Sequence, residues 1–469
     1  MNRRLRPRLS LFVFGIVLAV QVAVGNAQTP ATDNTFTVQR NGSVSVGCVP
    51  QRPNQQSIDL AHIEFNDNGT FAKAGQLDNA VDCITQARKN PNGAVVVLFV
   101  HGWHHNAAWT PSKNDGDEHF ASFRRILMSL ALREAERYSG GVESGRRVVG
   151  VYLGWNGDPQ SGFFGFIAKY VSTYPAFFER YKVAETIAAG TDIRETVRRV
   201  IAETKTGSGP DSPLALIGHS MGAMILEMSL EALVRQDQSI GASRSTSSES
   251  CVHVERNGQP AVFPDLVLLL NSAADADTSR SLITLLDQKR IRKVGTCDGR
   301  TFHAPLIIAA TSLGDTATRD WFRRAKPGHA TAANTPSLLT HRLTGESPRV
   351  RCLPRPLDHL ATDYEQTWHC LRSPSIANDQ ITDVAIDLPR ANVLRNDCHT
   401  RYRLLRTSTS QSVTPYWLLQ LETAIVSDHN DIFNRQASLL IMSFMQLSGS
   451  IVSVAKSWSD LFDPDQGPC

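Results

Sequence analysis

The chain contains no C-x-x-C pair, no internal repeat and, after the N-terminal segment, no apolar run long enough to cross a bilayer. Without a C-x-x-C pair, a zinc site has no support in the sequence. An excess of one charge sign is lacking as well. Removing the four arginines of residues 1–27 leaves 44 Lys and Arg against 45 Asp and Glu, a net charge of about −1. Nucleic-acid binding requires a basic surface, so no nucleic-acid partner is expected.

The N-terminal segment has the pattern of a secretory signal peptide. Four arginines and no acidic residue precede an apolar run from Leu9 to Val24, and small residues follow up to Ala27. The run is shorter than the roughly 20 residues of a membrane-spanning helix. We therefore expect cleavage after Ala27 and a periplasmic or extracellular protein. The alternative is an uncleaved anchor, and membrane association is expected only in that case.

All eight cysteines lie beyond residue 27. An even number in an exported chain favours disulfides, although the sequence alone does not give their connectivity. We expect Cys251 and Cys297 to link one flank of the core, and Cys352, Cys370 and Cys398 to brace a later insertion. Free buried thiols are the alternative.

Apolar strands alternate with amphipathic helices through most of the chain. The near-continuous β-branched run Ala94–Val100 is typical of a parallel strand that is covered on both faces. Apolar spacing predicts a helix over Asp117–Tyr138, and a further apolar run predicts a strand over Val148–Trp155. This alternation predicts a mostly parallel, doubly wound α/β sheet with helices on both faces. Further strands are predicted at 214–217, 265–270, 306–310 and 416–421, and further helices at 77–89, 194–203, 223–230, 279–289 and 434–447.

One large core is predicted over residues 61–449, after a signal peptide (1–27) and a lead-in (28–60) and before a tail (450–469). It opens with a hairpin over residues 61–72, whose turn is Asn66–Gly69. Three insertions interrupt it. They are an aromatic-rich stretch (157–181), a loop (236–260) and a cysteine-bearing excursion (320–414). The aromatic stretch either lines or covers an acyl pocket as a lid, or packs on the core as a helix.

Gly218-His219-Ser220-Met221-Gly222 has the pattern G-x-S-x-G. A short apolar strand, 213–217, precedes it, and a helix-forming apolar segment, 223–230, follows. A strand that turns at once into a helix must bend sharply, and such a bend exposes the serine hydroxyl as a nucleophile elbow. The pattern therefore predicts Ser220 as a nucleophile, with a glycine-rich turn around an inert serine as the alternative.

A nucleophilic serine needs a histidine base and an acid that orients it, and after an elbow they follow in the order acid, then histidine. Asp315 follows the predicted strand at 306–310, and catalytic groups gather at such carboxyl ends. Asp275 and Asp277 follow the preceding strand and are the alternative acids. Asp315 could instead cap the segment 316–322.

His429 follows the last predicted strand and is the expected base. His399 and His369 are alternatives, but both lie in the cysteine-bearing excursion. The remaining interpretation of His429 is a loop histidine near the start of a helix. A base at this position can reach a serine at the edge of the same sheet.

The oxyanion of an acyl-transfer reaction needs backbone donors. One is expected from Met221, the residue after the nucleophile, at a helix N-terminus. The other is expected from Trp103, because Gly102 lets the chain turn after the strand ending at Val100. The nearby His101, His104 and His105 do not by themselves form a tetrahedral site, so no metal is expected.

The four segments 100–103, 218–222, 313–315 and 428–430 together resemble the α/β-hydrolase superfamily, in particular an exported esterase-like or lipase-like serine hydrolase. The resemblance implies an eight-stranded, mostly parallel core and a Ser220–His429–Asp315 triad. It also implies hydrolysis of a small-molecule or lipid-like carboxylic ester through an acyl-enzyme, without a cofactor. Trp103 beside the oxyanion site is similar to the arrangement in enzymes for medium or long acyl chains. An amidase, peptidase or acyltransferase with the same triad is one alternative, and an inactive hydrolase-fold binding protein is the other.

Overall fold

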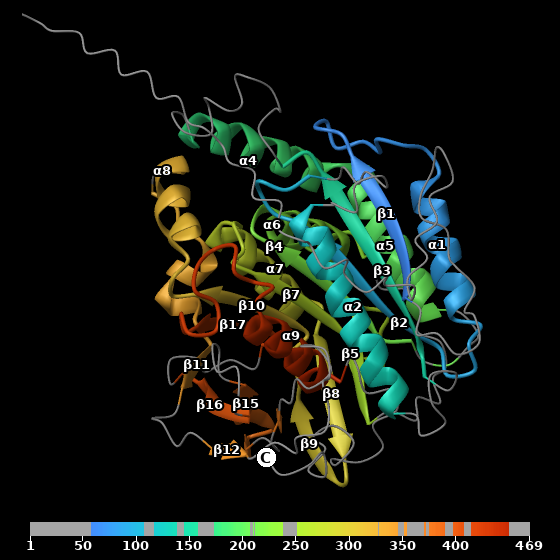
Figure 1. Cartoon of the computed structure of the whole chain (residues 1–469), viewed down its shortest axis with the longest axis vertical. Coiled ribbons are helices and arrows are strands. Elements are labelled where there is room, and N and C mark those ends of the chain that lie inside the picture. The colour runs from blue at the N-terminus through green and yellow to red at the C-terminus, as the bar shows by residue number, and fades with distance from the viewer. Residues whose placement is uncertain are drawn as a thin grey trace, which may run out of the picture.

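The computed structural model has mixed α/β architecture (Figure 1). The signal peptide predicted at 1–27, most of the lead-in and the tail predicted at 450–469 lie outside the described residues. The structure describes residues 58–106, 117–137, 145–157, 173–206, 210, 212–237, 251–326, 328–345, 351–353, 370–371, 375–389, 397–407 and 414–449.

The centre of the molecule is a row of parallel strands, as the alternating pattern predicts. Their order across the sheet is β1, β3, β2, β4, β7, β10, β17 and β11. Because every neighbouring pair is parallel, the carboxyl ends of these strands lie along one edge. The bounds are β1 Ile58–Phe65, β2 Ala94–Val100, β3 Arg147–Trp155, β4 Leu214–His219, β7 Leu266–Leu270, β10 Ile307–Ser312, β17 Tyr416–Leu421 and β11 His341–Gly345.

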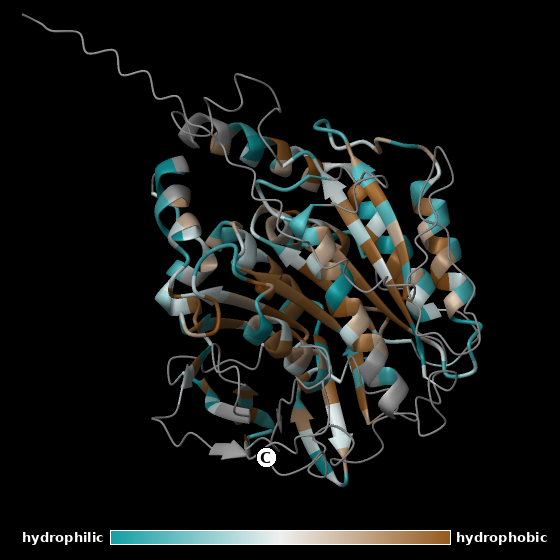
Figure 2. Ribbon diagram, in the orientation of Figure 1, coloured by the Kyte–Doolittle hydropathy of each residue, from teal (hydrophilic) through white to brown (hydrophobic). Residues whose placement is uncertain are grey.

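Helices cover both faces of this row (Figure 1). On one face pack α1 (Gln76–Ala87), α4 (Thr173–Ala189), α5 (Thr191–Thr206), α6 (Met221–Arg235) and α7 (Ala276–Gln288). On the other pack α2 (Glu118–Arg137) and α9 (Arg435–Leu447). Alternate residues of β2 enter the two cores, Val96 and Leu98 one of them and Val97 and Phe99 the other. Burial on both faces explains the uniformly hydrophobic central strands in Figure 2.

Antiparallel strands extend the sheet beyond its parallel centre. The prediction of a loop over residues 236–260 is wrong in part. β5 (Val252–Arg256) pairs with β8 (Ile291–Cys297), and β6 (Gln259–Pro260) pairs antiparallel with β5. β9 (Arg300–His303) follows β8 in the same ladder. The disulfide between Cys251 and Cys297 joins this ladder, which confirms the expected link.

The excursion predicted at 320–414 also carries strands. β16 (Asp397–Arg406) lies antiparallel between β11 and β15 (Gln380–Pro389), and the register places Cys352 opposite Cys398. The shorter elements here are β12 (Arg351–Leu353), β13 (Cys370–Leu371) and β14 (Ser375–Ala377). Four short helical elements precede these strands: η1 (Ala317–Trp321), α8 (Phe322–Ala325), η2 (Ala332–Asn334) and η3 (Pro336–Leu338).

Two further expectations need correction. The lead-in does not extend to residue 60, and the hairpin expected over residues 61–72 has only one full strand. β1 instead pairs in parallel with β3, and the second arm keeps a single bridge between Phe65 and Phe71. β1 pairs with β3 along its whole length. This pairing joins segments that are distant in sequence, so the local turn signal could not reveal it.

The aromatic stretch predicted at 157–181 is described in its last part only. There α4 buries Phe177 and Tyr181 against the core, as a packed helix does. Most of its other aromatic residues, Phe163, Phe164, Phe166 and Tyr170, lie outside the described residues. Among the helices that are described, none combines the length and the apolar character of a membrane span.

Glu227 lies on α6, the helix that follows Ser220, and places a carboxyl group in the core of the molecule. It is fully buried and accepts hydrogen bonds from Ser279 Oγ at 2.6 Å and Tyr416 OH at 2.7 Å. Burial raises the pKa of Glu227 to about 7, although these hydrogen bonds oppose the rise. The folded protein therefore keeps this proton at pH values where the unfolded chain has lost it.

The raised pKa of Glu227 should make the folded state less stable as pH rises. The unfolded chain releases the proton near 4.5 and the folded chain near 7, so the free energy of unfolding should fall across this window by roughly 3 kcal/mol from this group. In Glu227→Gln this pH-dependent part of the free energy of unfolding should vanish. Urea unfolding of both proteins at about pH 4.5, 6 and 8, which span the two pKa values of Glu227, measures it. Glu231→Gln, one turn along α6, is the control for charge removal. Identical pH dependence in wild type and Glu227→Gln would contradict the expectation.

Candidate active site

Ser220 stands at the junction between β4 and α6, in the bend that the sequence predicts. Its φ of 56° and ψ of −123° are disfavoured for a residue with a side chain. The flanking glycines are required by close approach. A Cβ atom on Gly218 would lie 2.6 Å from the Cα of Ala223, and one on Gly222 would overlap the carbonyl oxygens of Val100 and His101. The backbone N–H of Ser220 donates to the carbonyl of Leu270 at 2.9 Å, which fixes the bend to β7.

The side chains of Ser220, His429 and Asp315 form one hydrogen-bonded series. His429 Nδ1 lies 2.9 Å from Asp315 Oδ1, and His429 Nε2 lies 2.7 Å from Ser220 Oγ. A carboxylate only accepts, so Nδ1 carries the hydrogen and Nε2 accepts from the serine hydroxyl. Ser220 is 3% exposed and Asp315 2% exposed. The structure thus brings together the three residues singled out by strand order, at hydrogen-bonding distance for proton transfer.

Asp315 is held by more than the histidine. Its Oδ1 accepts from the backbone N–H of Thr318 at 3.0 Å, and its Oδ2 from the Thr318 hydroxyl at 2.5 Å. Burial alone would raise the pKa of Asp315, but His429 and the Thr318 donors together hold it below its usual range. Asp315 therefore stays ionised near neutral pH. Asp315 thus makes the contact with His429 expected of an orienting acid and also the local contacts expected of a cap for the following turn.

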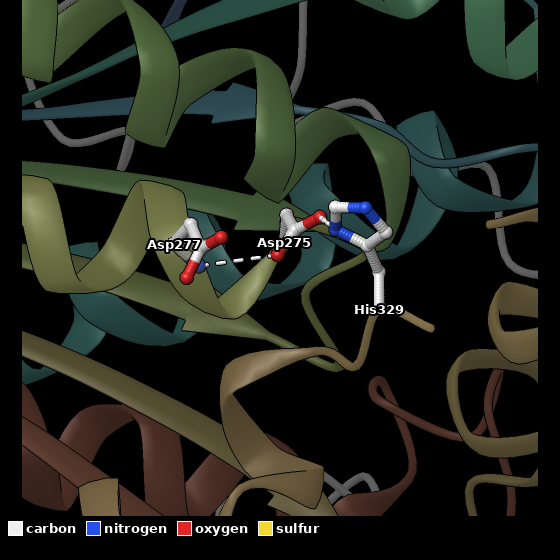
Figure 3. A group of neighbouring side chains, drawn as sticks. All are labelled: Asp275, Asp277 and His329. Carbon is white, nitrogen blue, oxygen red and sulfur yellow. Dashed lines mark hydrogen bonds and ion pairs between the residues drawn. The ribbon is translucent and has the colours of Figure 1, made fainter. Parts of the chain in front are cut away.

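The alternative acids lie in a different arrangement (Figure 3). Asp275 accepts from the backbone N–H of Asp277 as the N-cap of α7, and its other oxygen lies 2.6 Å from His329 Nδ1. Asp277 pairs with Arg280 at 2.7 Å. These carboxylates and His329 lie close enough to hold a cation, but their present contacts are those of a helix cap and a surface ion pair. Asp275 is thus bonded to a different histidine from the one beside Ser220.

Of the two alternative bases, one belongs to a strand of the antiparallel extension and the other is not described. His399 belongs to β16, where it is paired in register with Arg351 and Pro389. His369 lies outside the described residues. Its neighbour in sequence, Cys370, starts β13, which pairs with β15 in the antiparallel extension.

The loop after β2 passes directly against Ser220. A Cβ atom on Gly102 would lie 2.8 Å from the Cβ of Ser220, so only glycine allows this approach. Met221 is the first residue of α6, where backbone N–H groups have no partner within the helix. Among the described residues, the backbone amides of Met221 and Trp103 have no hydrogen-bond acceptor. Both predicted oxyanion donors therefore lie in segments that border Ser220, Met221 directly after it and Trp103 directly after Gly102.

The histidines near this loop brace the backbone. His101 Nδ1 donates to the carbonyl of Gly102 at 2.9 Å, and its Nε2 accepts from the N–H of Trp155 at 3.0 Å. Burial lowers the pKa of His101 to about 4, so the ring is neutral. His105 Nδ1 lies 2.9 Å from Asp117. With both ring nitrogens engaged by the backbone, His101 ties β2 to β3 and supports the turn at Gly102.

Three residues of this site were not singled out in the sequence. Thr318 lies one helical turn after Asp315, a spacing that is typical of local capping. His219 and Asn271 bond to the main chain of His429, as described below. Only the position of His219 inside the G-x-S-x-G motif could have signalled its importance.

Comparison with known proteins gives no further guide to this arrangement. The chain matches no protein-family model, no curated protein and no solved structure.

Proposed function

We propose that this chain is an exported α/β-hydrolase that cleaves carboxylic esters through an acyl-enzyme. The observation that carries the proposal is the series Ser220, His429 and Asp315, bonded at 2.7 and 2.9 Å around a serine in a disfavoured backbone conformation. A helix cap or a structural hydroxyl has no need of this conformation, whereas a nucleophile presented at a sharp bend does. An inert binding protein with the same fold is disfavoured for that reason.

The reaction begins with Ser220 Oγ attacking the ester carbonyl carbon while His429 Nε2 takes the hydroxyl proton. The negative charge that develops on the carbonyl oxygen is stabilised by the amides of Met221 and Trp103. The tetrahedral intermediate then breaks its bond to the alcohol oxygen, which leaves with the proton from His429. Water, deprotonated by the same imidazole, attacks the acyl-enzyme; the bond between the acyl carbon and Ser220 Oγ then breaks, His429 returns the proton to Oγ, and the carboxylic acid leaves. Throughout, ionised Asp315 orients His429 and stabilises its imidazolium form.

An apolar acyl group is the substrate that the neighbouring side chains favour. The Trp103 ring meets Phe177 edge-on at 5.2 Å, Phe177 stacks on Tyr181 at 6.0 Å, and Tyr181 meets Phe322 at 6.0 Å. The hydroxyl of Tyr181 also donates to the carbonyl of Ala273. The backbone N–H of Ala273 in turn donates to the carbonyl of Ser220. These aromatic side chains are buried in the core beside Ser220, and on this side of the site we propose that the apolar acyl group lies.

Export is supported by the Cys251–Cys297 disulfide together with the N-terminal pattern. Structural disulfides persist in oxidising compartments and are rare in the cytosol. Expression of the full chain in a bacterium, followed by N-terminal sequencing of the periplasmic product, should give a chain that starts at Gln28. A full-length product retained in the membrane fraction would support the uncleaved anchor instead.

Covalent labelling with a fluorophosphonate tests the enzyme itself. The native protein should be labelled stoichiometrically, and mass spectrometry of the digest should locate the phosphonate on the peptide that contains Ser220. Heat-unfolded protein is the control and should remain unlabelled. Turnover of nitrophenyl esters of graded chain length, compared with the matching anilides and with alcohol acceptors, then separates an esterase from an amidase, peptidase or acyltransferase. A folded, unlabelled wild-type protein would contradict the proposal and favour a binding protein.

A further inference from the structure

The main-chain carbonyl of His429 accepts hydrogen bonds from two buried side chains. His219 Nε2 lies 2.8 Å from this oxygen, and Asn271 Nδ2 also lies 2.8 Å from it. The Asn271 amide reaches the carbonyl of Asp428 as well, at 3.4 Å. His429 itself lies in an irregular segment between β17 and α9. Its position is thus set by donors from two other strands rather than by its own secondary structure.

His219 is suited to this role because it is neutral. It is fully buried, and burial together with the proximity of His429 lowers its pKa far below the usual range. A neutral imidazole carries one N–H, and a carbonyl only accepts, so that hydrogen is on Nε2. His219 directly precedes Ser220, so the serine and the donor that holds its base share one stretch of backbone.

Asn271 links the same carbonyl to two further strands. It directly follows β7, and its backbone φ of 46° is a conformation that asparagine tolerates better than most residues. Its Oδ1 accepts from the N–H of Ser312 on β10 at 3.0 Å, which sets the orientation of the amide and directs Nδ2 to His429. The Ser312 hydroxyl in turn donates to the carbonyl of Val426. The ends of β4, β7 and β10 therefore all bind the segment that carries the base.

We propose that His219 and Asn271 are positioning residues, which hold the His429 carbonyl so that its imidazole stays aligned between Ser220 and Asp315. The proposal rests on the proposed function of this triad. With the carbonyl fixed, the imidazole can move only by its own side-chain torsions. Without one donor, the segment can shift, and a displacement of about 1 Å in a reacting group can cost roughly 100-fold in rate.

Three substitutions separate the loss of the donor from the loss of packing. His219→Gln keeps an N–H near the position of Nε2, whereas His219→Phe keeps a ring and removes the donor. Asn271→Asp keeps the acceptor for Ser312 and tolerance of the backbone conformation, and in assays at alkaline pH, where its carboxyl is ionised, it has no hydrogen to donate to His429. We expect kcat to fall roughly 10- to 100-fold in His219→Phe and Asn271→Asp, with KM within about threefold of wild type. His219→Gln should recover most of the loss.

Ser427→Ala is the matched control on the same segment. Its hydroxyl donates to Asp431 at 2.7 Å and does not reach His429, so kcat should stay near the wild-type value. Thermal unfolding of every variant shows which of them are folded, and if His219→Phe fails to fold, the comparison of Asn271→Asp with Ser427→Ala decides. An equal loss in Ser427→Ala, or full kcat in a folded Asn271→Asp, would overturn the proposal.

A measurement without turnover distinguishes this proposal from the proposed function. The Nδ1 proton of His429, bonded to Asp315, should give a protected downfield resonance in the proton NMR spectrum of the resting wild-type protein. In His219→Phe and Asn271→Asp this resonance should broaden or exchange faster, whereas Ser427→Ala should preserve it. An unchanged resonance in both would refute the positioning role, even in an active enzyme. The resonance could instead be lost in these variants while the wild-type protein neither reacts with fluorophosphonate nor cleaves esters. That result would refute only the proposed function.

Discussion

Replacing either Ser220 or His429 with alanine should lower kcat for an ester substrate by roughly 10⁶-fold, and replacing both should cost little more. The two side chains act as one unit, because the serine has no nucleophilic strength without the base 2.7 Å away. KM should change little, since neither side chain is proposed to bind the acyl group. Steady-state kinetics on a nitrophenyl ester measure the effect, and fluorophosphonate labelling should be lost in Ser220→Ala.

The residual rate of these variants is also informative. The Met221 and Trp103 amides remain in place, so a rate above that of the uncatalysed reaction should persist, at roughly 10³- to 10⁴-fold. Wild-type contamination must be excluded by active-site titration. Additive losses in the double variant would mean that the two residues act separately, and substantial labelling of His429→Ala would remove His429 as the base.

The elbow could be predicted from sequence because its causes are local. The two glycines that the bend needs both lie within two residues of Ser220, so the motif marks them, although Gly222 approaches the end of β2, which is distant in sequence. Asp315 and His429 could be located only through the order of the strands, which places both at the carboxyl edge of one parallel sheet. His219 and Asn271 could not be recognised, because their common acceptor is a main-chain oxygen that no side-chain pattern marks.

The parallel centre was predictable for a related reason. Strands such as β2 are buried on both faces, so that they appear as unbroken β-branched runs. The long strands of the excursion instead mix polar and apolar residues and have no unbroken β-branched run. In β16, Arg401 pairs with Asp387 of β15 at 2.8 Å, and such a cross-strand ion pair is visible only once the two strands are known to be neighbours. The excursion therefore becomes part of the sheet through pairings distant in sequence.

Asp315→Asn should lower kcat about 10⁴-fold, whereas Asp275→Asn should leave it within about threefold of wild type, which follows from their different partners. Asparagine at 315 has the shape of the carboxylate but lacks its charge, and its amide can donate to His429. The imidazole would then keep its hydrogen on Nε2, the nitrogen that must accept from Ser220. Asparagine at 275 remains a good helix cap and changes only the contact with His329.

The pH profile adds a second criterion for the acid. The pKa of Asp315 is held below its usual range by His429 and Thr318, despite burial, so the carboxylate is charged throughout the neutral range. Loss of this charge should therefore lower wild-type kcat only well below about pH 4, which is the ordinary pKa of aspartate. Thr318→Val removes one of its donors and should move this acid limit upward, without the large loss caused by Asp315→Asn. If Asp275→Asn proved the more damaging substitution, the hydrogen bond between Asp315 and His429 would be structural, and the acid of the triad would have to be sought beside His329.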